Sequence, residues 1–146
     1  MSLNGGMPQS VLFACTLNAV RSPMAEALAR QLLPRNVFIA SAGIRKSEVD
    51  GFAVAVMREV DLDIGSHIPQ NIEEIGCTAF DIIVALSPEA EQFAREVVRA
   101  TATEVEFWPI PDLSGAGETR SQRLDAFREV REMLRRRIRA RFYGVE

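Results

Sequence analysis

Cys15 and Arg21 are the residues whose types and spacing point most directly to chemistry. They lie six positions apart, and Thr16-Leu17-Asn18-Ala19-Val20 stands between them. A cysteine thiolate is a nucleophile, and a guanidinium can hold two oxygens of a phosphate at once. A loop that carries both residues predicts nucleophilic attack on a bound oxyanion, such as a phosphoryl group.

The flanking sequence predicts a strand before this loop and a helix after it. Residues 10–14 are short, apolar and β-favouring, as expected of a buried parallel strand. Ser22 and Pro23 predict the N-cap and first residue of a helix that continues to Arg30. Because N–H groups at a helix N-terminus attract anions, we expect the loop from Thr16 to Ser22 to bind the oxyanion and to favour the thiolate of Cys15.

At these residues the sequence resembles the low-molecular-weight protein tyrosine phosphatases and the related thioredoxin-coupled arsenate reductases. Both share a C-x5-R-[S/T] loop, and the match includes Asn18 and the run Arg21-Ser22-Pro23. The resemblance implies that Asn18 braces the loop and that Ser22 hydrogen-bonds the thiolate. It also implies supporting roles for Ser41, in a segment that resembles the one after the family's second strand, and for His67, the only histidine.

The resemblance also supplies a general acid. The family has an aspartate in a loop near the C-terminus, and Asp112 in Trp108-Pro109-Ile110-Pro111-Asp112-Leu113 matches it. A carboxylic acid placed there can protonate the leaving group and later activate a water molecule. Cys15, Arg21 and Asp112 are thus the expected catalytic residues.

The rest of the sequence alternates strand-like and helix-like segments, which predicts an α/β domain with a parallel sheet. The resemblance implies three α/β/α layers, strand order 2-1-3-4, and the Rossmann-like phosphotyrosine phosphatase I type of fold. Nucleophile and acid loops would meet at the carboxyl edge of the sheet. Further strands are expected at 37–40, 80–86 and 105–108, and further helices at 51–60, from 88, and at 119–141.

Three departures from the family pattern leave alternatives open. Leu17 stands where the family often has glycine, Val20 where eukaryotic members have a second cysteine, and Leu113 where proline usually follows the acid. The cysteine relay of the arsenate reductases is also incomplete, because the chain has only Cys15 and Cys77. The main prediction is phosphomonoester hydrolysis through a phosphocysteine; the alternatives are arsenate reduction with an external thiol, or a non-catalytic phosphate or arsenate sensor.

Composition sets wider limits. The 146 residues predict one domain over 10–146 behind a flexible tail over 1–9. Two cysteines, no long apolar run and no signal-like N-terminus predict a cytoplasmic protein without a membrane partner.

Expected partners are a phosphorylated protein or small aryl phosphate, and inorganic phosphate or other oxyanions. No metal or cofactor is expected, because the loop N–H groups and Arg21 can neutralise the phosphoryl charge. Residues 120–141 are rich in arginine, yet the net charge of −3 argues for a solvated helix face or a patch for an acidic partner over a nucleic-acid site.

Overall fold

The computed structural model describes residues 7–145, apart from the side chain of Cys77. Most of the tail expected at the N-terminus, residues 1–6, lies outside this part. Gln9, at the end of the expected tail, is described and is hydrogen-bonded to the sheet region. Its carbonyl accepts a hydrogen bond from the Phe38 N–H, and its own N–H donates to the Asp81 carboxylate. No helix of the described chain is long and apolar enough to cross a bilayer.

The expected parallel sheet is confirmed, with order β2-β1-β3-β4. Its strands are β1 (Ser10–Cys15), β2 (Phe38–Gly43), β3 (Ile82–Ala85) and β4 (Glu104–Phe107). The helices are α1 (Arg21–Leu32), α2 (Gly51–Arg58), α3 (Ile72–Ile75), α4 (Pro88–Val97) and α5 (Arg120–Tyr143), with a 3-10 turn at Cys77–Ala79.

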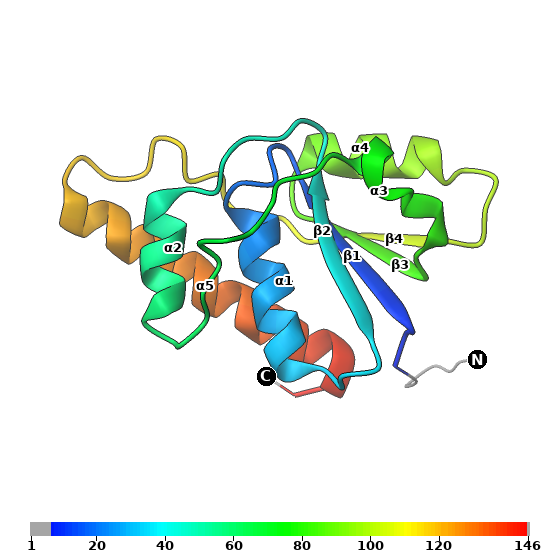
Figure 1. The fold of residues 1–146 in the computed structure, drawn as a ribbon, viewed down its shortest axis with the longest axis horizontal. Helices are drawn as coiled ribbons and strands as arrows, with labels where there is room; N and C mark the ends of the chain where they lie inside the picture. The colour runs from blue at the N-terminus through cyan, green and yellow to red at the C-terminus, as the bar shows by residue number, and fades with distance from the viewer. Residues whose placement is uncertain (1–6, 146) are drawn as a thin grey trace.

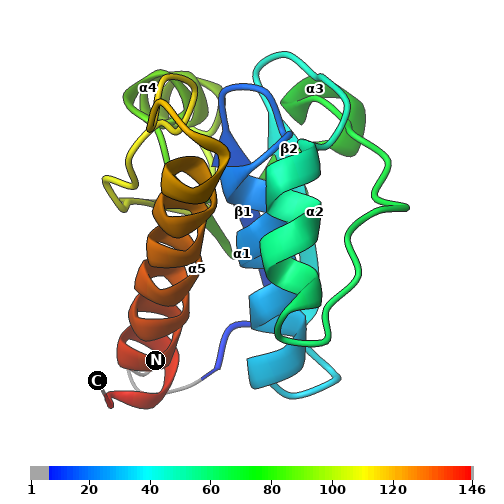
Figure 2. The same ribbon diagram turned by 90° about the vertical axis from the view of Figure 1, so that its left-hand side faces the viewer.

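The helices cover both faces of the sheet and make the three layers expected from the resemblance. Helices α1, α2 and α5 pack on one face, and α3 and α4 on the other (Figures 1 and 2). Successive residues of a strand point to opposite faces. Val11 and Phe13 of β1 accordingly enter the core under α1 and α5, whereas Leu12 and Ala14 face α4.

Helix α5 supplies the longest apolar stripe against this sheet. Phe127, Val130, Leu134 and Ile138 are all nearly inaccessible to solvent, as their helical spacing predicts. Burying one such large side chain contributes about 1.5–3 kcal/mol. The stripe therefore fixes α5 beside α1 and α2, and its N-terminal end comes to the edge where the loop after β1 lies (Figure 2).

Several element boundaries differ from those expected. Strand β2 continues three residues past Ala40 because it pairs in register with β1 up to Cys15 opposite Gly43. Strands β3 and β4 are Ile82–Ala85 and Glu104–Phe107, and helix α2 ends at Arg58, before Asp61 with its φ of 64°. The short helix α3 was not expected, although Asn71 and Glu74 form a capping box at its start.

The carboxyl ends of the strands lie at one edge of the sheet, where ligands bind in such folds. Backbone hydrogen bonds tie the loops there together: Leu86 N–H donates to the Ala14 carbonyl, and Trp108 N–H donates to the Ala85 carbonyl. The nucleophile loop after β1 and the acid loop after β4 are thereby brought to the same edge, as the sequence predicted.

Candidate active site

The loop between β1 and α1 is held by its carbonyl groups. Four backbone N–H groups of the segment after β2 donate to four consecutive or nearly consecutive carbonyls of the loop. The pairs are Ile44 to Cys15, Arg45 to Thr16, Ser47 to Leu17 and Asp50 to Ala19, at 2.9–3.1 Å. By contrast, the N–H groups of residues 16–20 donate to no other described residue. These N–H groups are left free to bind an oxyanion.

Gly43 makes this close approach of the two segments possible. A Cβ atom at this position would lie 2.3 Å from the Arg45 carbonyl oxygen and 2.7 Å from the Asn18 nitrogen. Real Cβ atoms do not come so near to backbone atoms, so a larger residue would push the loop away. Glycine is required here for close packing of backbone against backbone.

The start of α1 differs from the prediction. Its N-cap is Val20, with φ −132° and ψ −73°, and no side chain caps the helix. Ser22, which was expected to be the N-cap, lies inside the helix and is fully buried. An uncapped start leaves the first N–H groups of the helix unpaired, which suits a loop that binds an anion in place of a side-chain cap.

Ser22 contacts the nucleophile instead. Its Oγ lies 2.8 Å from Cys15 Sγ, and Asn18 Nδ2 donates to the same oxygen at 2.9 Å. Because that oxygen accepts from Asn18, its proton is free to be donated, and the sulfur at 2.8 Å is a nearer acceptor than the Ala42 carbonyl at 3.5 Å. Cys15 as a whole is 2% exposed. A hydroxyl that donates to sulfur stabilises the thiolate form.

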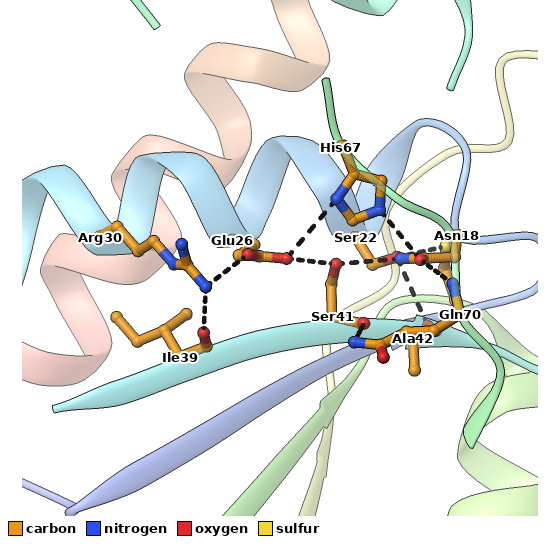
Figure 3. A network of polar contacts seen from close by, with 10 residues as sticks. Asn18, Ser22, Glu26, Arg30, Ile39, Ser41, Ala42, His67 and Gln70 are labelled. Carbon is orange, nitrogen blue, oxygen red and sulfur yellow. Dashed lines mark hydrogen bonds and ion pairs between the residues drawn. The ribbon is translucent and has the colours of Figure 1, made fainter. Parts of the chain in front are cut away.

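Asn18 is the centre of the support beneath the loop (Figure 3). It has φ 54°, a left-handed conformation that asparagine tolerates better than most residues. The Gln70 backbone N–H donates to Oδ1 at 2.9 Å, which fixes the orientation of the amide because an N–H can only donate. Nδ2 then donates to Ser22 and, at 3.0 Å, to Ser41. The amide thus links α1, β2 and the segment before α3.

His67 completes the contacts of Asn18. Its Nε2 lies 3.0 Å from Asn18 Oδ1, and since a carboxamide oxygen only accepts, Nε2 carries the proton. Its Nδ1 faces Glu26 at 4.0 Å. Burial lowers the pKa of His67 below its usual value, while the charge of Glu26 acts in the opposite direction. The structure therefore brings together the four side chains expected to support the loop, Asn18, Ser22, Ser41 and His67.

Three further residues belong to this support, although the sequence analysis did not single them out. Glu26 accepts a hydrogen bond from Ser41 at 2.5 Å and pairs with Arg30 at 2.8 Å, while Arg30 also donates to the Ile39 carbonyl. Gln70 donates through its side chain to the Ser41 carbonyl at 3.0 Å. Of these three residues, only Glu26 could have been found from local sequence, because it lies four residues after Ser22 and therefore on the same helix face.

Arg21 lies at the base of the site and is 9% exposed. One terminal nitrogen, Nη1, donates to the Ile110 carbonyl at 3.0 Å and to the Leu86 carbonyl at 3.3 Å. These bonds fix the guanidinium between the loops after β3 and β4. Its other N–H groups make no hydrogen bond to a described residue, so they can hold the oxygens of a bound phosphate.

A cavity of about 430 Å³ opens above this loop. Of the predicted loop residues, those that line it are Cys15, Thr16, Leu17, Ala19, Val20 and Arg21. The side chains of Asn18 and Ser22 lie behind the loop, fully buried, and take part in the support network. The loop thus has an outer side that faces a ligand and an inner side that is hydrogen-bonded to the domain.

Asp112 lines the same cavity as Cys15 and Arg21, so the structure brings the three expected catalytic residues together. Its carboxylate is exposed and accepts a hydrogen bond from the Ser114 backbone N–H at 3.0 Å. This bond lowers the pKa of Asp112 below its usual value, and the nearby charge of Arg21 acts in the same direction. A dianion bound in the loop would have the opposite effect and favour the protonated acid.

The residues that depart from the family pattern shape the cavity wall. Positive φ angles of non-glycine residues occur, in the described chain, at Asn18 and Asp61, so Leu17 has an ordinary backbone conformation. The Leu17 side chain is 41% exposed and lines the cavity together with Leu113 and Phe127. Leu17 and Leu113 therefore change the wall and leave the conformation of the loop intact.

A cysteine and an arginine in an anion-binding loop, on a parallel sheet of this order, define the class of cysteine-dependent phosphatases. Residues 10–143 match the model of the low molecular weight phosphotyrosine protein phosphatases, and the chain belongs to this family.

The names of similar proteins include arsenate reductases, tyrosine phosphatases and an arginine phosphatase. The glutaredoxin arsenate reductase of Synechocystis sp. is 31% identical over 130 residues, which cover 89% of this chain and 93% of that protein. The tyrosine phosphatase Wzb from Escherichia coli K30, solved with sulphate, has a TM-score of 0.79 at 22% identity and covers 94% of this chain and 99% of that chain.

An arsenate reductase in the phosphate binding state has a TM-score of 0.71 at 26% identity, with 94% of this chain and 99% of that chain covered. The first of these two proteins was thus solved with sulphate, and the second with phosphate bound.

Proposed function

We propose that this protein hydrolyses aryl phosphate monoesters, of the phosphotyrosine type, through a phosphocysteine at Cys15. The observation that carries the proposal is the shared cavity, which is lined by Cys15, in a loop with free N–H groups, and by Arg21 and Asp112. Leu17, 41% exposed at the cavity wall, offers an apolar side chain on which an aromatic leaving group can pack.

The reaction comprises two in-line displacements at phosphorus. The Cys15 thiolate attacks the phosphorus atom, the bond from phosphorus to the leaving oxygen breaks, and Asp112 donates a proton to that oxygen. A water molecule then gives a proton to Asp112 and attacks phosphorus, and the thiolate leaves with the electrons of the P–S bond. Arg21 and the loop N–H groups balance the charge of the transferring group in both steps.

Steady-state release of phosphate from an activated aryl phosphate tests this proposal. Cys15→Ser should lower turnover by about 10⁴-fold or more, because the hydroxyl is a far weaker nucleophile in this setting. It should retain phosphate or vanadate binding, since the loop N–H groups and Arg21 are unchanged. Normal turnover by Cys15→Ser would refute the nucleophile assignment.

Arsenate reduction is the second candidate, favoured by the name of the 31% identical relative. In this reaction Cys15 attacks arsenate, and water leaves with formation of a sulfur–arsenic bond. An external thiolate attacks the Cys15 sulfur, arsenite departs with the bonding electrons, and a disulfide forms between Cys15 and that thiol. A second external thiol restores Cys15.

Arsenite formation with glutathione and glutaredoxin distinguishes the two candidates. Hydrolysis of aryl phosphate without arsenite formation supports the phosphatase, whereas the reverse supports the reductase. Tight binding of phosphate or arsenate without either reaction would instead indicate a sensor. The proposed partners are accordingly phosphorylated protein or small aryl phosphates, in the cytoplasm, where thiols stay reduced.

A further inference from the structure

The candidate active site contains arginines that the proposed mechanism does not use. Arg21 lies at the base of the cavity, but Arg45 in the loop after β2 and Arg123 in the first turns of α5 also line it. Both arginines therefore lie where an anion that enters the cavity can reach them.

Arg123 is held in place but lacks a hydrogen-bond partner. Its Nε is buried and, in the described part of the chain, is the single buried side-chain nitrogen or oxygen without a partner. Its Cζ lies 5.0 Å from the centroid of the Phe52 ring, which packs on Phe127 with centroids 5.6 Å apart. Buried polar groups are almost always hydrogen-bonded, so this unpaired N–H makes Arg123 an exception, and the half-buried residue as a whole lines the cavity.

Three other arginines of α5 form ion pairs with carboxylates of neighbouring elements. Arg128 and Arg131 bind Glu59 at 2.7 and 2.8 Å, and Arg141 binds Glu106 at 2.6 Å. Arg123 forms no ion pair with a described residue. Arg123 shares this lack of an ion pair with Arg120 and Arg136, but unlike Arg136 it lines the cavity that holds Cys15.

The position of Arg123 in the helix is also unfavourable without an anion. The first turn of α5 has no acidic residue, and Arg120 and Arg123 both lie near Phe52 at its N-terminal end. Cations at that end oppose the helix dipole, and such local conflicts are typical of functional sites. A bound anion would relieve the conflict with both the dipole and the two guanidinium groups.

The carboxylates around the cavity are mostly engaged elsewhere. Asp50 accepts from the N–H groups at the start of α2, Glu89 accepts from Thr16, and Asp112 accepts from Ser114. The fourth, Glu48, is exposed and forms no ion pair with a described residue. Arg123 forms no ion pair with any of these four carboxylates, so an incoming anion would meet its guanidinium without displacing one.

We infer that Arg123, assisted by Arg45, binds a carboxylate of the substrate that lies beside the phosphorylated side chain. The preferred substrate is then a phosphotyrosine peptide with an acidic residue next to the phosphotyrosine. The inference rests on the proposed function and names its substrate class. A guanidinium suits this task because its planar fork matches a carboxylate with two parallel hydrogen bonds.

Two phosphotyrosine peptides that differ only in Glu or Gln beside the phosphotyrosine test the inference, because they share one leaving group. The ratio of their kcat/KM values should be about tenfold in favour of Glu for the unmodified protein. It should fall to about one in Arg123→Met, which keeps the apolar stem over Phe52. Arg136→Met, which removes an exposed charge of the same helix outside the cavity, should keep the ratio.

Arg123→Lys sharpens the result, because it keeps the charge without the planar fork and should give an intermediate ratio. Equal kcat/KM values for the two peptides with the unmodified protein would overturn the inference. A ratio that survives in Arg123→Met, or that falls equally in Arg136→Met, would also overturn it.

Calorimetric binding of both peptides to Cys15→Ser separates this inference from the proposed function. Tighter binding of the Glu peptide that is lost when Arg123→Met is added supports the inference even if the unmodified protein hydrolyses neither peptide. Hydrolysis of both peptides at one rate, with equal binding, overturns the inference alone and leaves the phosphatase proposal standing.

Discussion

The nucleophile loop and the acid loop of the candidate active site are held in opposite ways. Asn18 and Ser22 behind the nucleophile loop are fully buried, and their side chains are hydrogen-bonded to α1, β2 and the segment before α3. Asp112 in the acid loop is exposed, and its carboxylate accepts one local bond from Ser114. One loop is fixed by the whole domain and the other mainly by its own backbone.

The backbone of the acid loop is nevertheless anchored. Trp108, Ile110 and Leu113 are buried, and the Ile110 carbonyl accepts a hydrogen bond from Arg21. This leaves the Asp112 carboxylate positioned by its backbone but free in its side chain. The group that must meet phosphorus at one distance is thus fixed, whereas the group that serves varied leaving groups keeps some freedom.

Replacing Asp112 with Asn should have the largest effect, and it should depend on the leaving group. We expect a loss of about 10²–10⁴-fold in kcat for phenol-like leaving groups that need a proton, and little loss for activated ones. The measurement is kcat for a series of aryl phosphates whose leaving-group pKa values differ. Equal slowing across the series would contradict the role of Asp112 as acid.

Replacing Gly43 with Ala should damage the fixed loop and slow all leaving groups alike. A Cβ 2.7 Å from the Asn18 nitrogen and 2.8 Å from the Leu17 carbonyl carbon must displace the loop. We expect about 10²-fold lower kcat/KM and a loss of about 1–3 kcal/mol in the free energy of unfolding. Denaturant unfolding and the same aryl phosphate series measure both effects.

Gly51→Ala is the matched control for this substitution, because no atom lies within 4 Å of a Cβ at that position. It should leave activity unchanged and alter stability by no more than about 0.5 kcal/mol. If Gly43→Ala behaved like Gly51→Ala, the close approach would not be needed for the site.

Asn18→Gly and Asn18→Ala should separate the two roles of Asn18. Both lose the amide contacts, but Gly permits the φ of 54° and Ala does not do so readily. We expect a loss of about 1–3 kcal/mol for Gly, from unpaired buried groups, and about 1 kcal/mol more for Ala. Activity should fall about tenfold or more in both and, as with Gly43→Ala, equally for all leaving groups. Equal stability of the two variants would show that the backbone angle matters little.

The smallest expected effect is the change of stability with pH that arises from His67, which supports the nucleophile loop through Asn18. Burial lowers the pKa of His67 in the folded protein, so the unfolded chain binds a proton more readily. The contribution of neutral His67 to stability is present above the usual value of about 6.5 and is lost as pH falls below it. Thermal unfolding between pH 8 and 5 should show a fall in Tm that is smaller in His67→Gln. A pH profile unchanged by His67→Gln would contradict this.

Much of this arrangement could be predicted from local sequence. Cys15, Arg21 and Asp112 do share one cavity, and the helix opened by Ser87 and Pro88 begins as expected, with Ser87 as its N-cap. The N-cap prediction at Ser22 was wrong, because a serine inside a helix can hydrogen-bond a buried partner with its hydroxyl in place of capping the helix. Here that partner is Cys15, seven residues earlier.

Local residue types determined the strand, loop and helix that carry Cys15, since their apolar patterns and helix formers act over a few residues. Only the tertiary structure decided that Gly43 must lack a side chain, that Gln70 orients Asn18, and that Arg123 faces the same cavity as Cys15. These contacts join residues far apart in the chain. Their existence depends on strand order and helix packing, which place the partners within hydrogen-bond distance, and no local pattern encodes that distance.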